Sequence, residues 1–228
     1  MKCGLQSTDT FYMESNDKGL IRSVMHGNPD AYMSLVERYL DVVSRTAFRI
    51  LCDREDSEAV TVKVFESLWY DVLDYDDRTS LRVWLLHRAW IFCRLRIMKR
   101  RVLRVMGISS DMFVRAAPKV DDHDDYIVKQ AWEVLCRASA HMTPLQRAVY
   151  ALAVLEGLDP AEVAEITGFT HFRVTLALQR AETKVRDELL HFEKDDVYEK
   201  YTSFLKRVSD GMTDREHLAV YIISQLDI

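Results

Sequence analysis

The chain has 228 residues, long for one domain and short for three, and its 48% hydrophobic and 29% charged residues exclude a disordered protein. The formal net charge of -5 excludes a nucleic-acid binder that is basic over its whole surface, so any phosphate contact must come from clustered Lys and Arg. No stretch approaches the ~18 apolar residues of a membrane span, and the first residues lack the apolar core of a signal peptide. We therefore expect a cytoplasmic protein without membrane insertion.

The expected fold class is all-α. Seven Gly and four Pro are few for a strand-and-turn architecture, and runs of alternating polarity are scarce. We expect two helical domains joined by a flexible linker, with a helix-turn-helix in the second domain and a helical hairpin at the C-terminus. The expected divisions are an N-terminal segment at 1–19, a first domain at 20–104, a linker at 105–126, a second domain at 127–190 and an extension at 191–228.

The first domain ends in the longest basic run of the chain. No acidic residue interrupts this run, whose cations are Arg94, Arg96, Lys99, Arg100, Arg101 and Arg104. Trp84, Trp90 and Phe92 lie on the same stretch, close to Arg82 and Arg88. Interleaved cations and planar side chains are typical of surfaces that bind single-stranded nucleic acid, because bases stack and phosphates pair with cations. The alternative is a solvated cationic face with its aromatic residues in the core, which suits Trp84 better and leaves Trp90 undecided.

Two further groups of residues could be imagined as sites. The run 121–125 holds four Asp and one His, but consecutive side chains diverge and no second patch of ligands accompanies them, so a solvated linker is favoured over a metal site. The cysteines show no C-x-x-C spacing and are expected to be reduced and buried; they are Cys3, Cys52, Cys93 and Cys136. No nucleophile–base pair and no Gly-rich phosphate loop is recognisable, so we expect no enzyme activity and no cofactor.

The second domain carries clear helix boundaries. Thr143 is an expected N-cap followed by Pro144 at the first helical position, and Gly157 is expected to end that helix. Another helix is expected to begin at Asp159, where Glu162 has the spacing that completes a capping box.

The stretch 159–186 predicts a helix-turn-helix. Ala164 provides the small side chain that two closely crossing helices need, and Gly168 provides the residue tolerant of positive φ in the turn. Val174 would then pack the second helix onto the first. The side chains expected to face outward, toward a major groove, are His171, Phe172, Arg173, Thr175 and Arg180. The alternative is an ordinary helical hairpin, which shares the apolar stripe but does not require Ala and Gly at these positions.

The extension at 191–228 is expected to form two helices around a turn at Asp210-Gly211. Its first helix would carry an apolar stripe, and its second would be capped by Thr213 with Glu216. The stripe consists of Val197, Tyr201, Phe204, Leu205 and Val208. The extension holds more acid than base, so docking near the recognition helix would oppose phosphate binding, whereas docking elsewhere would make it a scaffold or a dimer contact.

The second domain resembles a known family. Residues 142–152 (MTPLQRAVYAL) and 156–168 (EGLDPAEVAEITG) are similar to the fourth conserved region of sigma-70 factors, which in that family reads the minus-thirty-five promoter element. The resemblance implies that the duplex-contacting residues are Thr170, His171, Phe172, Arg173, Thr175, Arg180 and Lys184. This chain has Thr175 and Ala177 where the family usually carries cations, which weakens the expected attraction to phosphates.

The first domain resembles the second conserved region of the same family. The matching segments are 20–22 (LIR), 27–32 (GNPDAY), 53–58 (DREDSE), 64–65 (VF), 68–69 (LW) and 75–85 (YDDRTSLRVWL), the last leading into a basic helix. In the family this helix holds the melted minus-ten strand. The implied strand-contacting residues are Arg82, Arg88, Trp90, Arg94, Arg96, Lys99, Arg100 and Arg101.

The same region implies a surface for core RNA polymerase. Its expected residues are Asp53, Arg54, Asp56, Glu58, Val62, Lys63 and Glu66. Where the family usually has an acid and a Gln-Glu pair, this chain has Ala59, Val62 and Lys63, which changes the charge and hydration of the surface.

Together the two regions identify the chain as similar to extracytoplasmic-function (ECF) sigma factors. The implied function is transcription initiation, with core RNA polymerase, promoter DNA and a possible anti-sigma factor as partners. The alternative is a degenerate sigma-like regulator that acts by protein–protein contact without promoter recognition.

Overall fold

The computed structural model describes residues 17–76, 78–107, 125–190 and 215–225, together with Tyr201 and Lys206. All regular elements in these ranges are helices, so the expected all-α fold is confirmed. A first helix spans 17–25, and the others are α2 (Pro29–Leu51), α3 (Arg54–Tyr70), the 3-10 turn η1 (Val72–Asp74), α4 (Leu81–Val105), α5 (Asp125–Ala140), α6 (Pro144–Val149), the π-helical turn η2 (Tyr150–Leu155), α7 (Pro160–Thr167), α8 (His171–Leu190) and α10 (Arg215–Ser224). Most of the expected N-terminal segment, most of the expected linker and most of the hairpin stripe lie outside the described residues.

Local capping fixes where the first helices begin. The Asn28 side chain accepts hydrogen bonds from the backbone N–H groups of Asp30 (2.9 Å) and Ala31 (3.3 Å), which otherwise lack intrahelical partners. Helix α2 ends at Cys52, whose φ of 53° turns the chain directly into the next helix. Asp53 caps that helix through the N–H of Asp56 (2.9 Å).

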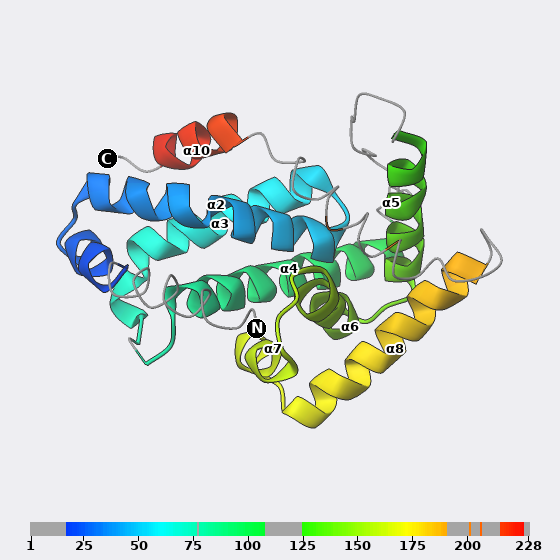
Figure 1. Ribbon diagram of the computed structural model, residues 1–228. Helices are drawn as coiled ribbons and strands as arrows, with labels where there is room; N and C mark the ends of the chain where they lie inside the picture. Colours follow the sequence, from blue (N-terminus) through cyan, green and yellow to red (C-terminus); the bar gives the residue numbers. More distant parts are fainter. Residues whose placement is uncertain are drawn as a thin grey trace.

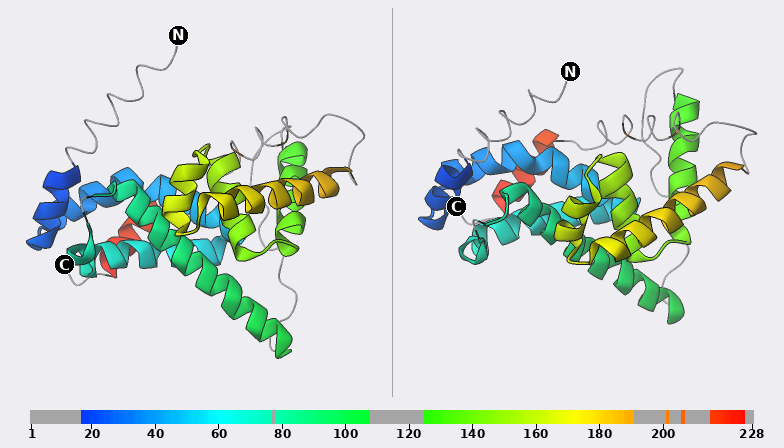
Figure 2. Two further views of the ribbon diagram at one scale, coloured as in Figure 1. Left: turned by 90° about the horizontal axis from the view of Figure 1, so that it is seen from below. Right: turned by 60° about the horizontal axis from the view of Figure 1, so that its bottom comes forward.

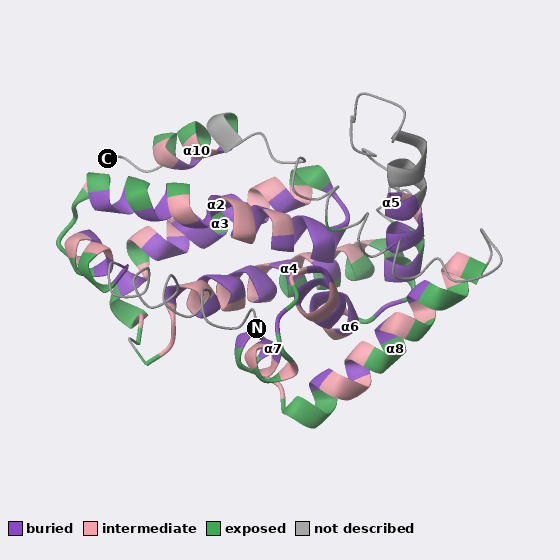
Figure 3. Ribbon diagram, in the orientation of Figure 1, coloured by how far each residue is buried: buried purple, intermediate pink, exposed green. Residues whose placement is uncertain are grey.

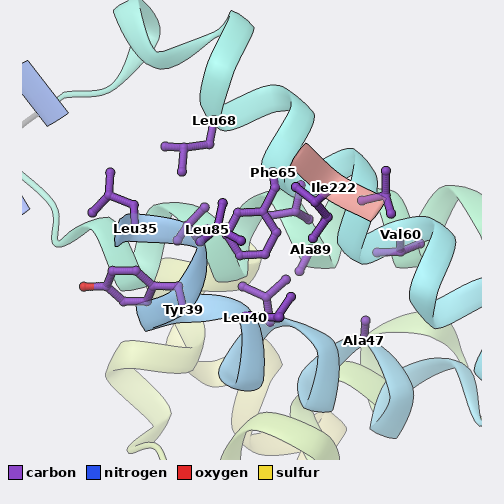
Figure 4. Packing of buried hydrophobic residues seen from close by; sticks show 14 of the residues in the cluster. Leu35, Tyr39, Leu40, Ala47, Val60, Phe65, Leu68, Leu85, Ala89 and Ile222 are labelled. Atoms are coloured by element: carbon purple, nitrogen blue, oxygen red, sulfur yellow. The ribbon is translucent and has the colours of Figure 1, made fainter. Parts of the chain in front are cut away.

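Helices α2, α3 and α4 form the first unit around one apolar core. The spacing of apolar residues on α2 places side chains such as Leu35, Leu40 and Ala47 toward α3 and α4, while its opposite side is exposed (Figure 3). Phe65 of α3 and Leu85 of α4 are fully buried in the same cluster (Figure 4).

The second unit contains α5 to α8, and it packs directly on the first (Figure 1). Phe48 of α2 stacks on Trp132 of α5 with ring centroids 4.3 Å apart. Val83 and Leu86 of α4 share a buried cluster with residues of α7 such as Val163 and Ile166. The apolar cores therefore continue from one unit into the other. We call this packing of the second unit on the first the closed arrangement.

Polar contacts also join the two units. His87 of α4 bonds through Nδ1 to the carbonyl oxygen of Ile166 (2.7 Å), at the end of α7. Arg45 of α2 forms an ion pair with Glu156 (2.9 Å), and Arg49 also pairs with this carboxylate. Because the Glu156 and Arg49 side chains are nearly buried, these charges reinforce one closed arrangement rather than a loose association.

Two parts of the C-terminal extension are described. The Tyr201 side chain is buried against α5, where its hydroxyl donates to the carbonyl oxygen of Ala131 (2.7 Å). Helix α10 lies on α2 and α3, on the side of the first unit away from α7 and α8 (Figure 1). None of the described helices combines the length and apolarity that crossing a bilayer requires.

Candidate nucleic-acid and polymerase interfaces

Helix α4 carries the expected strand-binding residues. Ser80 caps it by accepting a hydrogen bond from the N–H of Val83 (3.3 Å). Its N-terminal half is covered by α7, whereas its C-terminal half projects from the body of the molecule, as both views of Figure 2 show. The contacts of each cation, rather than its position along α4, show which of the expected residues are engaged inside the protein.

Most of the expected strand-binding cations of α4 have partners within the protein. The pairs are Arg82 with Glu162 (3.5 Å), Arg88 with Asp71 (3.6 Å), Arg96 with Asp56 (3.1 Å), Arg100 with Asp53 (2.9 Å), and Arg101 with the carbonyl oxygen of Met142 (3.0 Å). Arg94 and Lys99 are exposed and form no ion pair within the part of the chain that the structure describes. These two cations are therefore the ones that α4 offers to a phosphate without breaking an internal contact.

Trp90 is a core residue in this structure. Its side chain is 2% exposed, and its Nε1–H donates to the carbonyl oxygen of Thr167 at the C-terminus of α7 (3.1 Å). Sequence reasoning left stacking and burial open for this residue, and the closed structure places it in the core because the second unit covers it. Its ring becomes available to a base only if α7 leaves α4.

Helices α7 and α8 stand where the helix-turn-helix is expected. Asp159 caps α7 by accepting from the N–H groups of Ala161 (2.7 Å) and Glu162 (3.0 Å), and Gly168 ends it with φ of 71°. The Glu162 side chain pairs with Arg82 instead of completing the expected capping box. Burial raises the pKa of Glu162, and Arg82 opposes this shift. The full capping box in this unit is instead the one between Thr143 and Gln146.

The outer face of α8 presents several of the expected duplex contacts. Thr170, His171, Phe172, Arg173 and Arg180 are exposed, and Thr175 is half-buried. Lys184 contacts the protein itself, because its Nζ donates to the carbonyl oxygen of His141 (2.5 Å) and to Gln146 Oε1 (2.9 Å). Ala177 is buried in the core with Val174, so it is not on the outer face, where the comparison with the family's cations had placed it.

Cations of both helices meet in one groove. It lies between α4 and the α6–α8 side of the second unit and has a volume of about 450 Å³. Its lining includes four arginines and no acid: Arg94, Arg101, Arg173 and Arg180. Phe169 also lines it, with the Arg173 guanidinium 4.4 Å from its ring centroid. Phe169 was not among the site residues expected from the sequence. Its position four residues before Arg173 was the available signal for the cation–π contact between them.

The expected polymerase residues on α3 fall into two groups. Asp53 and Asp56 are at its N-terminus and face Arg96 and Arg100 of α4, so they hold the first unit together. Burial raises the pKa of the Asp56 carboxyl, while the two arginines act in the opposite direction.

The second group lies along the outer face of α3. Arg54 and Glu58 are partly exposed and form an ion pair one turn apart (2.8 Å), and Lys63 is exposed. Val62 is buried, with α10 beside it, and Glu66 is half-buried.

Among the residues that the structure describes, no group of His, Cys, Asp and Glu is arranged to hold a metal ion. The side chains of the acidic run 121–125 lie outside the described residues.

Solved structures with the same arrangement of helices are known. One is CnrH in complex with the cytosolic domain of CnrY, with a TM-score of 0.57 and 19% identity over 78% of this chain and 99% of the other. Another is the sigma factor RpoE in complex with the anti-sigma factor NepR from Bartonella quintana, with a TM-score of 0.53 and 15% identity over 70% and 97% of the respective chains. The fold is that of a sigma factor. No protein-family model and no curated protein sequence matches the chain significantly.

The two neighbours are covered almost whole, while about a fifth to a third of this chain lies outside the match. The sigma-factor fold thus accounts for most of the described helices, and the chain has additional residues beyond it.

Proposed function

We propose that this protein is a transcription initiation factor that binds core RNA polymerase and directs it to promoter DNA. In this proposal the first unit binds the polymerase and the melted minus-ten strand, and the second reads the minus-thirty-five element through α8. The observation that carries it is the groove in which Arg94 and Arg101 of α4 meet Arg173 and Arg180 of α8 without an acid among the lining residues. The sigma-factor fold supports the same assignment.

The closed arrangement requires an opening step in this proposal. The two promoter elements are separated by about 25 positions, as their names state, which corresponds to about 85 Å of duplex at 3.4 Å per base pair. A compact chain of this size has a radius of gyration of only about 17 Å. Since α4 and α8 face the same groove when closed, they must separate to reach both elements at once, which would also expose Trp90.

The partner we propose for the closed arrangement, in which the second unit packs on the first, is an anti-sigma factor. RpoE is bound to the anti-sigma factor NepR in its structure, and we extend this class of partner to the present chain. A protein bound across both units would stabilise the closed arrangement by mass action.

In-vitro transcription tests the proposal directly. We expect purified protein with the cognate core polymerase to produce a defined set of start sites on a genomic promoter library. A folded protein that binds polymerase or another factor yet starts no transcripts would instead support the second candidate function, a sigma-like regulator acting by protein–protein contact. The observation that favours this second candidate is that α3 is apolar around Ala59 and Val62 and that α10 packs beside these residues.

A binding experiment tests the free cations. We expect replacement of Arg94 and Lys99 by Ala to weaken single-stranded DNA binding and to reduce the slope of log K against log[salt] by about 1.4, since each phosphate contact contributes roughly 0.7. Arg78→Ala is the matched control, because Arg78 is 87% exposed and lies on the loop before α4, away from the groove. An unchanged slope in the folded double variant would remove α4 from the DNA interface.

A further inference from the structure

Helix α10 packs on α2 and α3 of the first unit. Leu218 and Ile222 are one turn apart and therefore share a face, and both are buried in the cluster that contains Val60 and Phe65 of α3. Figure 4 shows Ile222 among the core side chains of this unit. On the other side of α10, Val220 is 67% exposed. The helix thus uses one narrow apolar face to dock.

The docked state depends on this contact. A helix of ten residues, as α10 is, does not form stably by itself in water, because the cost of nucleation exceeds what so few hydrogen bonds return. Its structure therefore comes from packing on α2 and α3. A protein that binds the α3 surface in place of α10 would displace a helix with little stability of its own, so α10 can dock and undock reversibly.

The surface beneath α10 coincides with the expected polymerase surface. A groove of about 380 Å³ separates the two helices and is lined on the α3 side by Glu55, Glu58, Ala59, Val62, Lys63 and Glu66. Four of these belong to the polymerase set expected from the sequence: Glu58, Val62, Lys63 and Glu66. From the other side, His217, Leu218, Tyr221 and Gln225 complete the groove.

The unusual residues of α3 suit this contact. Ala59 and Val62 stand where a polar polymerase-binding surface is expected, and an apolar pair in that place is costly to leave in water. In the structure both line the groove with Leu218 of α10, and Val62 is 8% exposed. The substitution pattern on α3 and the apolar face of α10 are thus complementary parts of one contact.

We infer that α10 is an internal competitor of core RNA polymerase, which packs on the α3 surface around Val62 and must leave it before the polymerase binds. This inference rests on the proposed function, since it names the regulation of that same surface. In such an equilibrium the apparent Kd equals the intrinsic Kd divided by the fraction of molecules with the surface uncovered. Weakening the dock therefore tightens polymerase binding without adding any contact to the polymerase.

The test compares two variants of the full chain. We expect the double variant Leu218→Ala with Ile222→Ala to bind core polymerase at least about tenfold more tightly than the unchanged protein, because the uncovered fraction rises. Val220→Ala is the matched control on the exposed face of α10 and should bind with unchanged affinity. Thermal unfolding of each variant establishes that the rest of the molecule stays folded.

A second measurement needs no substitution. On addition of core polymerase to the unchanged protein, the backbone amides of residues 219–225 should exchange with deuterium faster, because α10 is released. Binding of polymerase with this protection intact, or equal affinities for the double variant and the unchanged protein, would overturn the inference alone. If neither protein binds polymerase while both are folded, the proposed function fails, and the competitor role fails with it.

Discussion

Leu86 offers the most direct test of the closed arrangement. It is fully buried, and apart from Val83 on the same helix the buried members of its cluster belong to residues 149–177 of the second unit. Replacing a fully buried Leu by Ala costs about 2–5 kcal/mol, from lost burial and from the cavity that remains. Since the lost contacts lie between the units, most of this cost should fall on their docking rather than on the folding of either unit.

This magnitude is large for a docking equilibrium. A loss of 2–5 kcal/mol changes the ratio of closed to open molecules by a factor of roughly 30 to 4,000, because each 1.4 kcal/mol is tenfold. We expect Leu86→Ala to increase the radius of gyration measured by small-angle X-ray scattering and to divide thermal unfolding into two transitions. Single-stranded DNA binding should become tighter, because α4 is uncovered.

Leu95→Ala is the matched control on the same helix. Leu95 is 57% exposed, and substitutions at such positions usually change stability by less than about 0.5 kcal/mol. The reasoning would be refuted by a Leu86→Ala protein that melts at a lower temperature in one transition with an unchanged radius of gyration. In that case the two units would fold as a single block, and opening would not precede promoter binding.

Three further predictions concern single side chains. Burial raises the pKa of Glu162, so the unchanged protein loses stability as pH rises through the folded-state pKa of this carboxyl. Glu162→Gln does not titrate, so its Tm minus the Tm of the unchanged protein should increase from about pH 4 to about pH 7. A difference that stays constant with pH would contradict this. Tyr201→Phe removes the 2.7 Å hydrogen bond to Ala131 and should lower the free energy of unfolding in urea by about 1 kcal/mol. Tyr221→Phe should not, because the Tyr221 side chain is 45% exposed. Asp159→Ala should cost about 1 kcal/mol and speed amide exchange in α7, and Asp159→Asn, which keeps the acceptor oxygen, should restore most of both; equal losses in the two variants would argue against the cap.

Helix boundaries could be predicted from the sequence because caps are local. Thr143 and Asp159 begin helices and Gly168 ends one, as the residue types alone indicate. Each cap needs only the residues within one turn, so no knowledge of the rest of the fold is required. The inner face of α8 was predictable for the same reason. Val174, Ala181 and Val185 follow the helical period and are buried, while Leu178 of the same stripe is half-buried.

The roles of the cations were only partly predictable. The sequence shows that α4 is basic, but it does not show that Arg96 and Arg100 face acids of α3 while Arg94 and Lys99 face solvent. An ion pair joins residues far apart in the chain, and its geometry follows from how α3 and α4 cross. Trp90 illustrates the same limit, because the acceptor of its indole N–H is the carbonyl oxygen of Thr167 in the other unit.

By itself the sequence determined that this chain is helical, where helices of the second unit start and stop, and which faces of the helices are apolar. Only the tertiary structure decided what covers those faces: α7 on α4, α5 against Phe48, and α10 on the α3 surface around Val62. The physical reason is that hydrophobic burial is not directional. An apolar stripe on a helix therefore indicates that this face is buried, but it does not indicate which element buries it. The choice among partners is made by shape and by a few oriented contacts, such as the ion pairs of Glu156, which form only once the whole chain is assembled.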